Sequence, residues 1–310
     1  MYSHQRLTAL AAAGMSGALL LTACGGGAED LTGGNGEAAE DVQEIDLAMI
    51  AWDDSIAVTS MWAVILEEKG YDVDITEIDV APAFQGLENG DIDAYLGVWL
   101  PVTHEEYWED YGESLESLGV WYDNAVLTLT VPSYMEDVDE IPDLVDHADE
   151  FGNRIVGIDP GAGLTRVTEE EAMPGYGLED DFELVTSSDA AMQAELSSAI
   201  AEEEPVVVTL WRPHSAYSQH DLKDLEDPAA YMGEAEDLHA VGREGFREDY
   251  PALTGWIDEW DMSDAELADL AGLTLVEYED DPKEGAREWL RQNPDFLELT
   301  LGEDAEGLEF

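Results

Sequence analysis

The feature that most constrains the fold is a short apolar run followed at once by a helix signal. Residues 94–98 (Ala-Tyr-Leu-Gly-Val) carry no polar side chain except the Tyr hydroxyl, which is typical of a strand covered on both faces. Trp99 ends this run, and the Thr103-x-x-Glu106 spacing predicts a capping box that opens a helix. A strand buried on both faces needs helices on both sides of its sheet. The segment therefore predicts an α/β fold, with Trp99 and His104 at the crevice where such sheets bind ligands.

A similar arrangement occurs later in the chain. The β-prone run 206–210 ends in Trp211-Arg212-Pro213-His214, and strands alternate with helical stripes on either side of it. We predict two lobes, each a mostly parallel sheet flanked by helices, with the ligand in the cleft between them. Lobe I covers residues 45–130 and the return segment of about 239–310, and lobe II covers residues 131–238.

The first 44 residues are predicted to lie outside the folded body. The Ala/Leu-rich run 7–21 is too short for a comfortable membrane span and reads as a signal peptide covering residues 1–23. Leu21-Thr22-Ala23-Cys24 resembles a bacterial lipobox, which implies that Cys24 carries a lipid; an ordinary secretory signal with an incidental Cys is the alternative. Residues 24–44, rich in Gly, Ala and acidic residues, are predicted to form a flexible tether. We therefore expect a protein outside the cytoplasm, on the outer face of the cell membrane and held there by lipid alone.

The acidic composition of the chain limits which kinds of partner it can bind. The chain has 74 acidic and 11 basic residues, yet 45% of it is hydrophobic, so it is not a disordered acidic tail. The acids are spread along the whole chain, which favours a fold adapted to high salt over an acidic surface for one basic partner. Nucleic-acid binding is excluded, because no basic patch exists to neutralise phosphates.

Three tryptophans, Trp52, Trp99 and Trp211, stand at or just beyond the ends of predicted strands. A single Trp in such a place is more often a core aromatic, as we expect for Trp62 and Trp289 on helical stripes. Three at equivalent positions favour a box of indole faces. A quaternary ammonium donates no hydrogen bonds, and cation–π attraction of about 0.5–2 kcal/mol per ring is how proteins hold it.

The other end of this pocket is predicted to hold an anion. Residues 161–164 (Gly-Ala-Gly-Leu) enter a helix whose first N–H groups lack intrahelical partners, although a Gly-rich turn is often only a tight turn. His104 is a candidate donor to the same anion, although a lone His is often structural. A cation at one end and a carboxylate at the other imply a small zwitterion.

These segments resemble the glycine betaine-binding proteins of bacterial ABC osmoprotectant importers. The resemblance runs from about residue 45 to 296 and rests on four motifs: Ala51-Trp52-Asp53-Asp54-Ser55-Ile56-Ala57, Trp99-Leu100-Pro101-Val102-Thr103-His104, Ile158-Asp159-Pro160-Gly161-Ala162-Gly163-Leu164 and Trp211-Arg212-Pro213-His214. It implies a two-lobed periplasmic-binding-protein-like fold, a monomer, and an importer permease and ATPase as partners.

The resemblance also implies the binding residues. Trp52, Trp99 and Trp211 would surround the trimethylammonium, while His104 and the backbone N–H groups of Gly163 and Leu164 would hold the carboxylate. The sequence departs from the family at Thr165-Arg166; Arg166 either contacts the carboxylate or points at solvent, and it is left out of the predicted site.

We expect no enzyme activity, no metal and no cofactor. The six His show no H-E-x-x-H spacing, no G-x-S-x-G is present, and Asp91-Ile92-Asp93 lacks the rest of a calcium loop. Among ligands, glycine betaine and proline betaine are favoured, and choline or carnitine stays open. A surface lipoprotein without a transport role, its tryptophans merely core, is the less favoured alternative.

Overall fold

The computed structural model describes residues 43–310. The predicted signal peptide, Cys24 and the tether as far as residue 42 lie outside the described residues. Within residues 43–310, none of the helices combines the length and the apolar character that crossing a bilayer needs.

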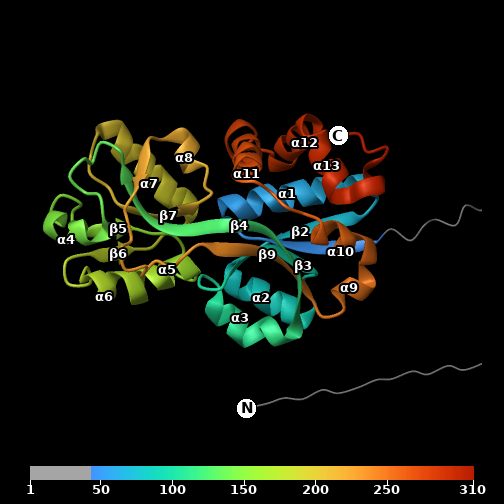
Figure 1. The fold of residues 1–310 in the computed structure, drawn as a ribbon, viewed down its shortest axis with the longest axis horizontal. Helices are drawn as coiled ribbons and strands as arrows, with labels where there is room; N and C mark the ends of the chain where they lie inside the picture. Colours follow the sequence, from blue (N-terminus) through green and yellow to red (C-terminus); the bar gives the residue numbers. More distant parts are fainter. Residues whose placement is uncertain (1–42) are drawn as a thin grey trace, which may run out of the picture. The chain divides into compact units, whose positions relative to one another are not determined.

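One path of hydrogen-bonded strands runs through the described part of the chain in the order β2-β1-β3-β9-β4-β7-β5-β6, with β8 paired to β4 (Figure 1). The strands are β1 (Glu44–Met49), β2 (Asp72–Glu77), β3 (Ala94–Leu100), β4 (Leu115–Pro132), β5 (Arg154–Val156), β6 (Glu183–Val185), β7 (Val208–Arg212), β8 (Leu222–Asp224) and β9 (Glu236–Arg243). Parallel pairs join β1 to β2 and β3, and β5 to β6 and β7. The long strands β4 and β9 pair antiparallel with their neighbours, so the sheet is mixed rather than mostly parallel.

Strand β4 joins two halves of the molecule. Its first part pairs with β9 and its last part with β7 and β8. We call β1, β2, β3, β9 and their helices the first half, and β5, β6, β7, β8 and their helices the second half. Only β4 and the connection from β8 to β9 carry the chain between them in the described residues. The lobe boundaries at residues 130 and 238 stay a prediction.

Helices cover both faces of the sheet in the first half, as the apolar strand predicts. These helices are α1 (Asp53–Glu68), α2 (Val80–Asn89), α3 (Glu105–Tyr111), α9 (Phe246–Asp249), α10 (Pro251–Asp258), α11 (Asp264–Ala271), α12 (Pro282–Gln292) and α13 (Pro294–Leu301). Helix α1 lies on one face under α11 and α12, while α2 and α3 lie on the other (Figure 1). The C-terminal helices therefore pack on the first half.

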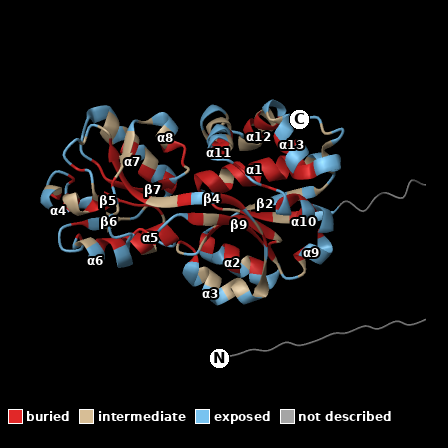
Figure 2. Cartoon of the chain, in the orientation of Figure 1, coloured by how far each residue is buried: buried red, intermediate tan, exposed pale blue. Residues whose placement is uncertain are grey.

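The core of the first half is built from aromatic side chains. Trp121 and Trp260 stack 4.5 Å apart, and Trp62 packs edge-on against Trp260 at 5.3 Å between ring centroids. Trp62 and Trp289 are each 1% exposed, which confirms the prediction that both are core residues. Figure 2 shows α1 buried along nearly its whole length, because the sheet covers one side and the C-terminal helices cover the other.

The helices of the second half are shorter. They are α4 (Leu144–His147), α5 (Gly163–Val167), α6 (Met173–Tyr176), α7 (Asp189–Glu202) and α8 (Ala216–Gln219), and a π-helical stretch, Thr168–Ala172, joins α5 to α6. Helix α7 buries Met192 and Leu196, whose spacing of four residues predicts the inner face of a helix. The predicted Gly-rich turn into a helix is confirmed, since α5 begins at Gly163.

Two predictions about helix starts are wrong. The Thr103 hydroxyl caps no helix: it donates to Glu236 at 2.5 Å, and α3 begins at Glu105 without a side-chain cap. Asp53, Asp54 and Ser55 are the N-cap candidates that residue type predicts for α1, but Trp52 occupies that position. The Ser55 hydroxyl instead accepts the Ile50 N–H at 3.0 Å. In both cases a partner outside the helix takes the side chain that local spacing had assigned to capping.

Candidate functional site

All six residues predicted to bind ligand line one cavity between the halves. Its volume is about 20 Å³, so its walls lie close together in this structure. The lining residues are Trp52, Asp54, Trp99, Thr103, His104, Leu127, Ile158, Ala162, Gly163, Leu164 and Trp211. The first half supplies two tryptophans and the imidazole, while the second supplies one tryptophan and the N-terminus of α5. The structure thus brings the predicted residues together; that they bind a ligand stays a prediction.

The three indoles are buried and differently anchored. None is more than 6% exposed. The indole N–H of Trp52 donates to Asp159 of the second half, and that of Trp99 donates to Asp54, both at 3.1 Å. The Trp211 indole N–H has no acceptor among the described residues. Two of the rings are therefore locked in rotation by hydrogen bonds, and the Trp52 bond also ties the halves together.

His104 is a neutral hydrogen-bond donor aimed at this site. Its Nδ1 accepts the backbone N–H of Trp99 at 2.9 Å, which places the proton on Nε2. Nε2 is buried and has no partner among the described residues. Burial, helped by the positive charge of Arg166, lowers the pKa of His104 to about 3, so the ring stays uncharged at any ordinary pH. An unpaired buried donor is costly unless a ligand accepts from it.

The N-terminus of α5 supplies two more donors. The first intrahelical bond runs from Arg166 N–H to Ala162, so the N–H groups of Gly163 and Leu164 lie before it, and neither has an acceptor among the described residues. Gly163 also lies directly against the other half: a Cβ built on it would lie 1.8 Å from the Thr103 carbonyl oxygen. Only glycine permits this approach.

Asp54 also lines the cavity, which the sequence analysis did not predict. Its carboxylate lines the cavity, is 3% exposed and accepts the Trp99 indole N–H. Burial raises the pKa of Asp54 to about 6, and the neighbouring Asp53 carboxylate adds to the rise while the Trp99 bond opposes it. Its position two residues after a strand-end Trp was the available signal, but an acid there is also an ordinary first-turn helix residue.

Comparison with known proteins now identifies the family. Residues 43–292 match the family model described as the substrate-binding domain of the ABC-type glycine betaine transport system. The chain belongs to this family. Its class is a substrate-binding protein of glycine betaine- or choline-type ABC transporters, a non-enzymatic role.

Individual members of this betaine-transport family agree in sequence and fold. The glycine betaine/carnitine transport binding protein GbuC of Listeria monocytogenes is 37% identical over 153 residues, 48% of this chain and 49% of that protein, so the match spans about half of its length. The crystal structure of ProX, a glycine betaine/L-proline-binding protein from Borrelia burgdorferi, is 30% identical, with a TM-score of 0.80, and covers 86% of this chain and 99% of that one. Lactococcal OpuAC, closed on glycine betaine, is 31% identical, with a TM-score of 0.75, over 82% and 97% of the two chains. The periplasmic-binding-protein-like fold is therefore confirmed.

In this family member, further contacts cross between the halves beside the cavity. Arg166 donates to the Val102 carbonyl at 2.8 Å, so it neither lines the cavity nor points only at solvent. The buried Glu236 carboxylate accepts the N–H groups of Val102 and Thr103 at 2.7 and 2.8 Å. The loop between Trp99 and His104 is thus held by β9 on one side and by α5 on the other.

Asp53, Asp189 and His214 form the one group of metal-capable side chains found in the described residues. They are buried, and one ligand atom of each lies within 4.8 Å of the others. Both ring nitrogens of His214 already have partners, because Nδ1 accepts the Ala216 N–H at 3.0 Å and Nε2 faces Asp189 at 3.3 Å. None of these three residues lines the cavity that holds Trp52, Trp99 and Trp211, which we call the indole cavity; only Asp54, next to Asp53 in the chain, does so.

Proposed function

We propose that this protein captures glycine betaine, or a closely related betaine, and delivers it to an ABC importer. The observation that carries the proposal is the shared cavity: three indoles, an unpaired imidazole N–H and two unpaired backbone N–H groups line one space between the halves. A zwitterion with a methylated cation at one end and a carboxylate at the other satisfies all of them.

The indoles suit the methylated cation. Each ring contributes about 0.5–2 kcal/mol, so three supply about 1.5–6 of the roughly 8 kcal/mol that a micromolar affinity requires. The Asp54 carboxylate, bonded to the Trp99 indole, adds negative charge to this part of the cavity. A desolvated cation gains from that charge, whereas a neutral osmolyte does not.

The donors suit a carboxylate. His104 Nε2–H and the N–H groups of Gly163 and Leu164 are each unpaired in this structure, and each is a donor without being a full charge. Hydrogen bonds from such groups to a charged acceptor contribute about 1.5–3 kcal/mol each. The carboxylate then relieves three unpaired donors in one step.

Carnitine and choline are the competing ligands. The Listeria relative is named for both glycine betaine and carnitine. Choline keeps the trimethylammonium but has no carboxylate, so it would leave the donor end unpaired. We therefore place choline behind the betaines.

Titration calorimetry in molar KCl tests the proposal, with glycine betaine, proline betaine, carnitine, choline and glycine as ligands. We expect micromolar binding of a betaine with quenching or a blue shift of Trp fluorescence, and no binding of glycine, which lacks the methyl groups. Absence of heat with every quaternary ammonium would favour a surface lipoprotein without a ligand. Recovery of chemically altered betaine after incubation would instead indicate an enzyme.

The lipid anchor and the adaptation to high salt belong to the same proposal. Attachment through Cys24 would hold the protein outside the cytoplasm near its permease and ATPase, as a monomer on the tether of residues 24–44. Cell fractionation after labelling with a fatty acid checks this: Cys24→Ala is expected to lose both the label and the membrane association.

A further inference from the structure

His214 belongs to the Trp211-Arg212-Pro213-His214 motif, but the indole cavity does not use it. Its side chain is fully buried, and its ring packs edge-on against Trp211 with 4.4 Å between ring centroids. It is absent from the residues that line the indole cavity. A buried imidazole that packs on a tryptophan of the indole cavity without lining the cavity itself needs another explanation.

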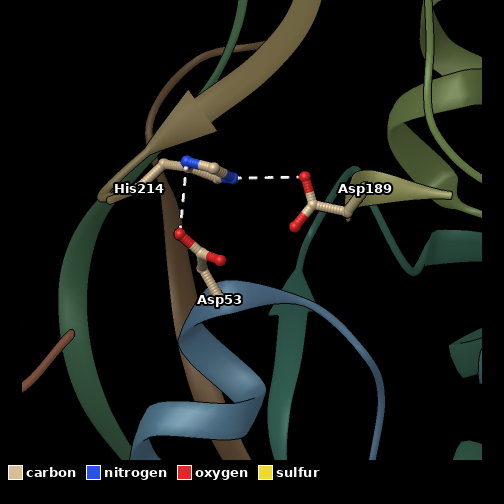
Figure 3. Close-up of side chains that lie close together, drawn as sticks. All are labelled: Asp53, Asp189 and His214. Atoms are coloured by element: carbon tan, nitrogen blue, oxygen red, sulfur yellow. Dashed lines mark hydrogen bonds and ion pairs between the residues drawn. The ribbon is translucent and has the colours of Figure 1, made fainter. Parts of the chain in front are cut away.

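Figure 3 shows His214 between two carboxylates that come from different helices. Nε2 lies 3.3 Å from Asp189 at the start of α7, in its own half. Nδ1 lies 3.3 Å from Asp53 at the start of α1, in the other half. The ring is therefore the central member of a chain that runs from one half to the other.

The contact to Asp53 depends on where the protons are. The Ala216 N–H donates to Nδ1 at 3.0 Å and the Ser215 N–H donates to Asp53 at 2.8 Å. If the ring is neutral and donates from Nε2 to Asp189, its one Nδ1 lone pair accepts the Ala216 N–H and Nδ1 has no proton to give to the Asp53 carboxylate. If the ring is an imidazolium, Nδ1 is no longer an acceptor, so the Ala216 N–H gives up its bond and Nδ1–H forms a charge-assisted hydrogen bond to Asp53 instead. The 3.3 Å between Nδ1 and Asp53 is thus a hydrogen bond when the ring is an imidazolium and a repulsive contact between two acceptors when the ring is neutral.

We propose that His214 is a positioning residue whose imidazolium latches the second half onto Asp53 and so holds the cage closed around its ligand. The latch regulates the proposed betaine site and therefore rests on the proposed function. Closing brings Asp53 to the ring, so closing and protonation favour each other. Ligand affinity should consequently depend on the charge of a residue that does not touch the ligand.

The surrounding charges favour the imidazolium. Burial by itself lowers the pKa of His214, but Asp53, Asp189 and Asp54 together outweigh it and raise the pKa above its ordinary value. A second cavity of about 350 Å³, which His214 also lines, presents Arg212, Tyr217 and Asp264. Arg212 is paired to Asp224, and its guanidinium stacks on the Tyr217 ring, so its charge is already compensated.

The direction of the pH dependence follows. For a histidine whose pKa is raised in the closed state, the latch contributes fully below pH 6.5 and is lost as the pH rises through the raised value. Asp54, with a pKa of about 6, is ionised above pH 7, and His104, with a pKa of about 3, is neutral there. A window from pH 7 to pH 9.5 therefore isolates the pair of His214 and Asp189, since burial raises the pKa of Asp189 as well.

The test measures the Kd of the full mature chain for glycine betaine across this window, in molar KCl. For the wild type we expect Kd to increase about tenfold from pH 7 to pH 9.5. His214→Gln is expected to bind about tenfold more weakly at pH 7 and to lose the pH dependence. Asp53→Asn should lose it too, because it removes the carboxylate of the other half. The matched control is His147→Gln, which removes a contact with Glu150 near the surface and should keep the wild-type profile.

Two results would overturn the latch: an unchanged pH profile in His214→Gln, or a neutral His214 ring at pH 7 in nitrogen-edited imidazole spectra of the betaine-bound wild type. The spectra need no variant, so they decide the matter even if a substitution prevents folding. Failure of the wild type to bind any quaternary ammonium would refute the proposed function as well. Betaine binding with a flat pH profile would refute the latch alone.

Discussion

The segments Trp99–His104 and Trp211–His214 look alike in sequence and do opposite things in the structure. Each has a strand-end Trp in the indole cavity, then a Pro, then a fully buried His. His104 accepts a backbone N–H and leaves Nε2 unpaired at the cavity, and its pKa falls to about 3 through burial. His214 lies between Asp53 and Asp189, and its pKa is raised despite the same burial.

Burial alone does not decide whether an imidazole is charged. Burial lowers the pKa of both rings, but three carboxylates around His214 reverse the outcome, whereas the charged neighbour of His104 is the cation Arg166. One histidine is thereby suited to donate to a ligand, and the other to hold the two halves together. The following predictions test whether the ligand-facing contacts and the contacts between the halves separate in this way.

The largest expected effect is at the contact between the halves. In Gly163→Ala the new Cβ would overlap the Thr103 carbonyl oxygen, at 1.8 Å, so the halves cannot close as they do here. We expect the affinity for glycine betaine to fall more than about 100-fold, or about 2.7 kcal/mol. Gly161→Ala is the matched control: its Cβ would come no nearer than 3.9 Å to Tyr107, and affinity should change less than about twofold. Equal affinities of the two variants, measured by calorimetry, would contradict the closure geometry.

The next effect concerns the cage itself. Trp99→Ala removes one cation–π wall and leaves the Asp54 carboxylate without its indole donor. We expect at least about tenfold weaker betaine binding and a smaller fluorescence change on binding. Trp289→Phe, in the distant core, should lower the melting temperature while the affinity stays close to wild type. An unchanged affinity in Trp99→Ala would remove this residue from the site.

A smaller effect is expected at the neutral donor. His104→Ala leaves the ligand carboxylate one hydrogen bond short, for an expected loss of about five- to tenfold at pH 7. Because the pKa of His104 is about 3, the ratio of variant to wild-type Kd should be constant from pH 7 to pH 9.5. A ratio that changes across this range would mean that His104, rather than His214, carries the pH dependence.

The smallest effect on affinity is expected from salt. The net charge of −63 makes the surface repel itself, so raising KCl from 0.1 to 2 M should increase the melting temperature by several degrees. The latch is buried, and the ratio of His214→Gln to wild-type Kd should stay within about twofold over the same range. A flat melting temperature would refute the adaptation to high salt. A latch effect that disappears in salt would show that the ion pair is open to solvent.

Much of the fold was predictable because apolar patterning reports burial directly. The pattern of the sequence predicts helices over 265–270 and 285–291 and a return crossing over 238–241. These segments lie inside α11, α12 and β9. Differences lie at the ends of elements: Pro82 predicts a helix start at its own position, but α2 begins two residues earlier, at Val80. Hydrogen-bonding side chains near a helix start have several possible partners, and spacing cannot tell which partner the fold supplies.

By itself, the sequence determined the alternation of strands and helices, the strand-end tryptophans and the Gly-rich helix start, since these follow from local periodicity and residue type. Only the tertiary structure decided that Thr103 serves Glu236, that Asp54 enters the cage, and that two similar histidines take opposite roles. The reason is physical: hydrogen-bond partners and pKa values depend on charges and donors brought together from distant parts of the chain, and no local spacing records those neighbours.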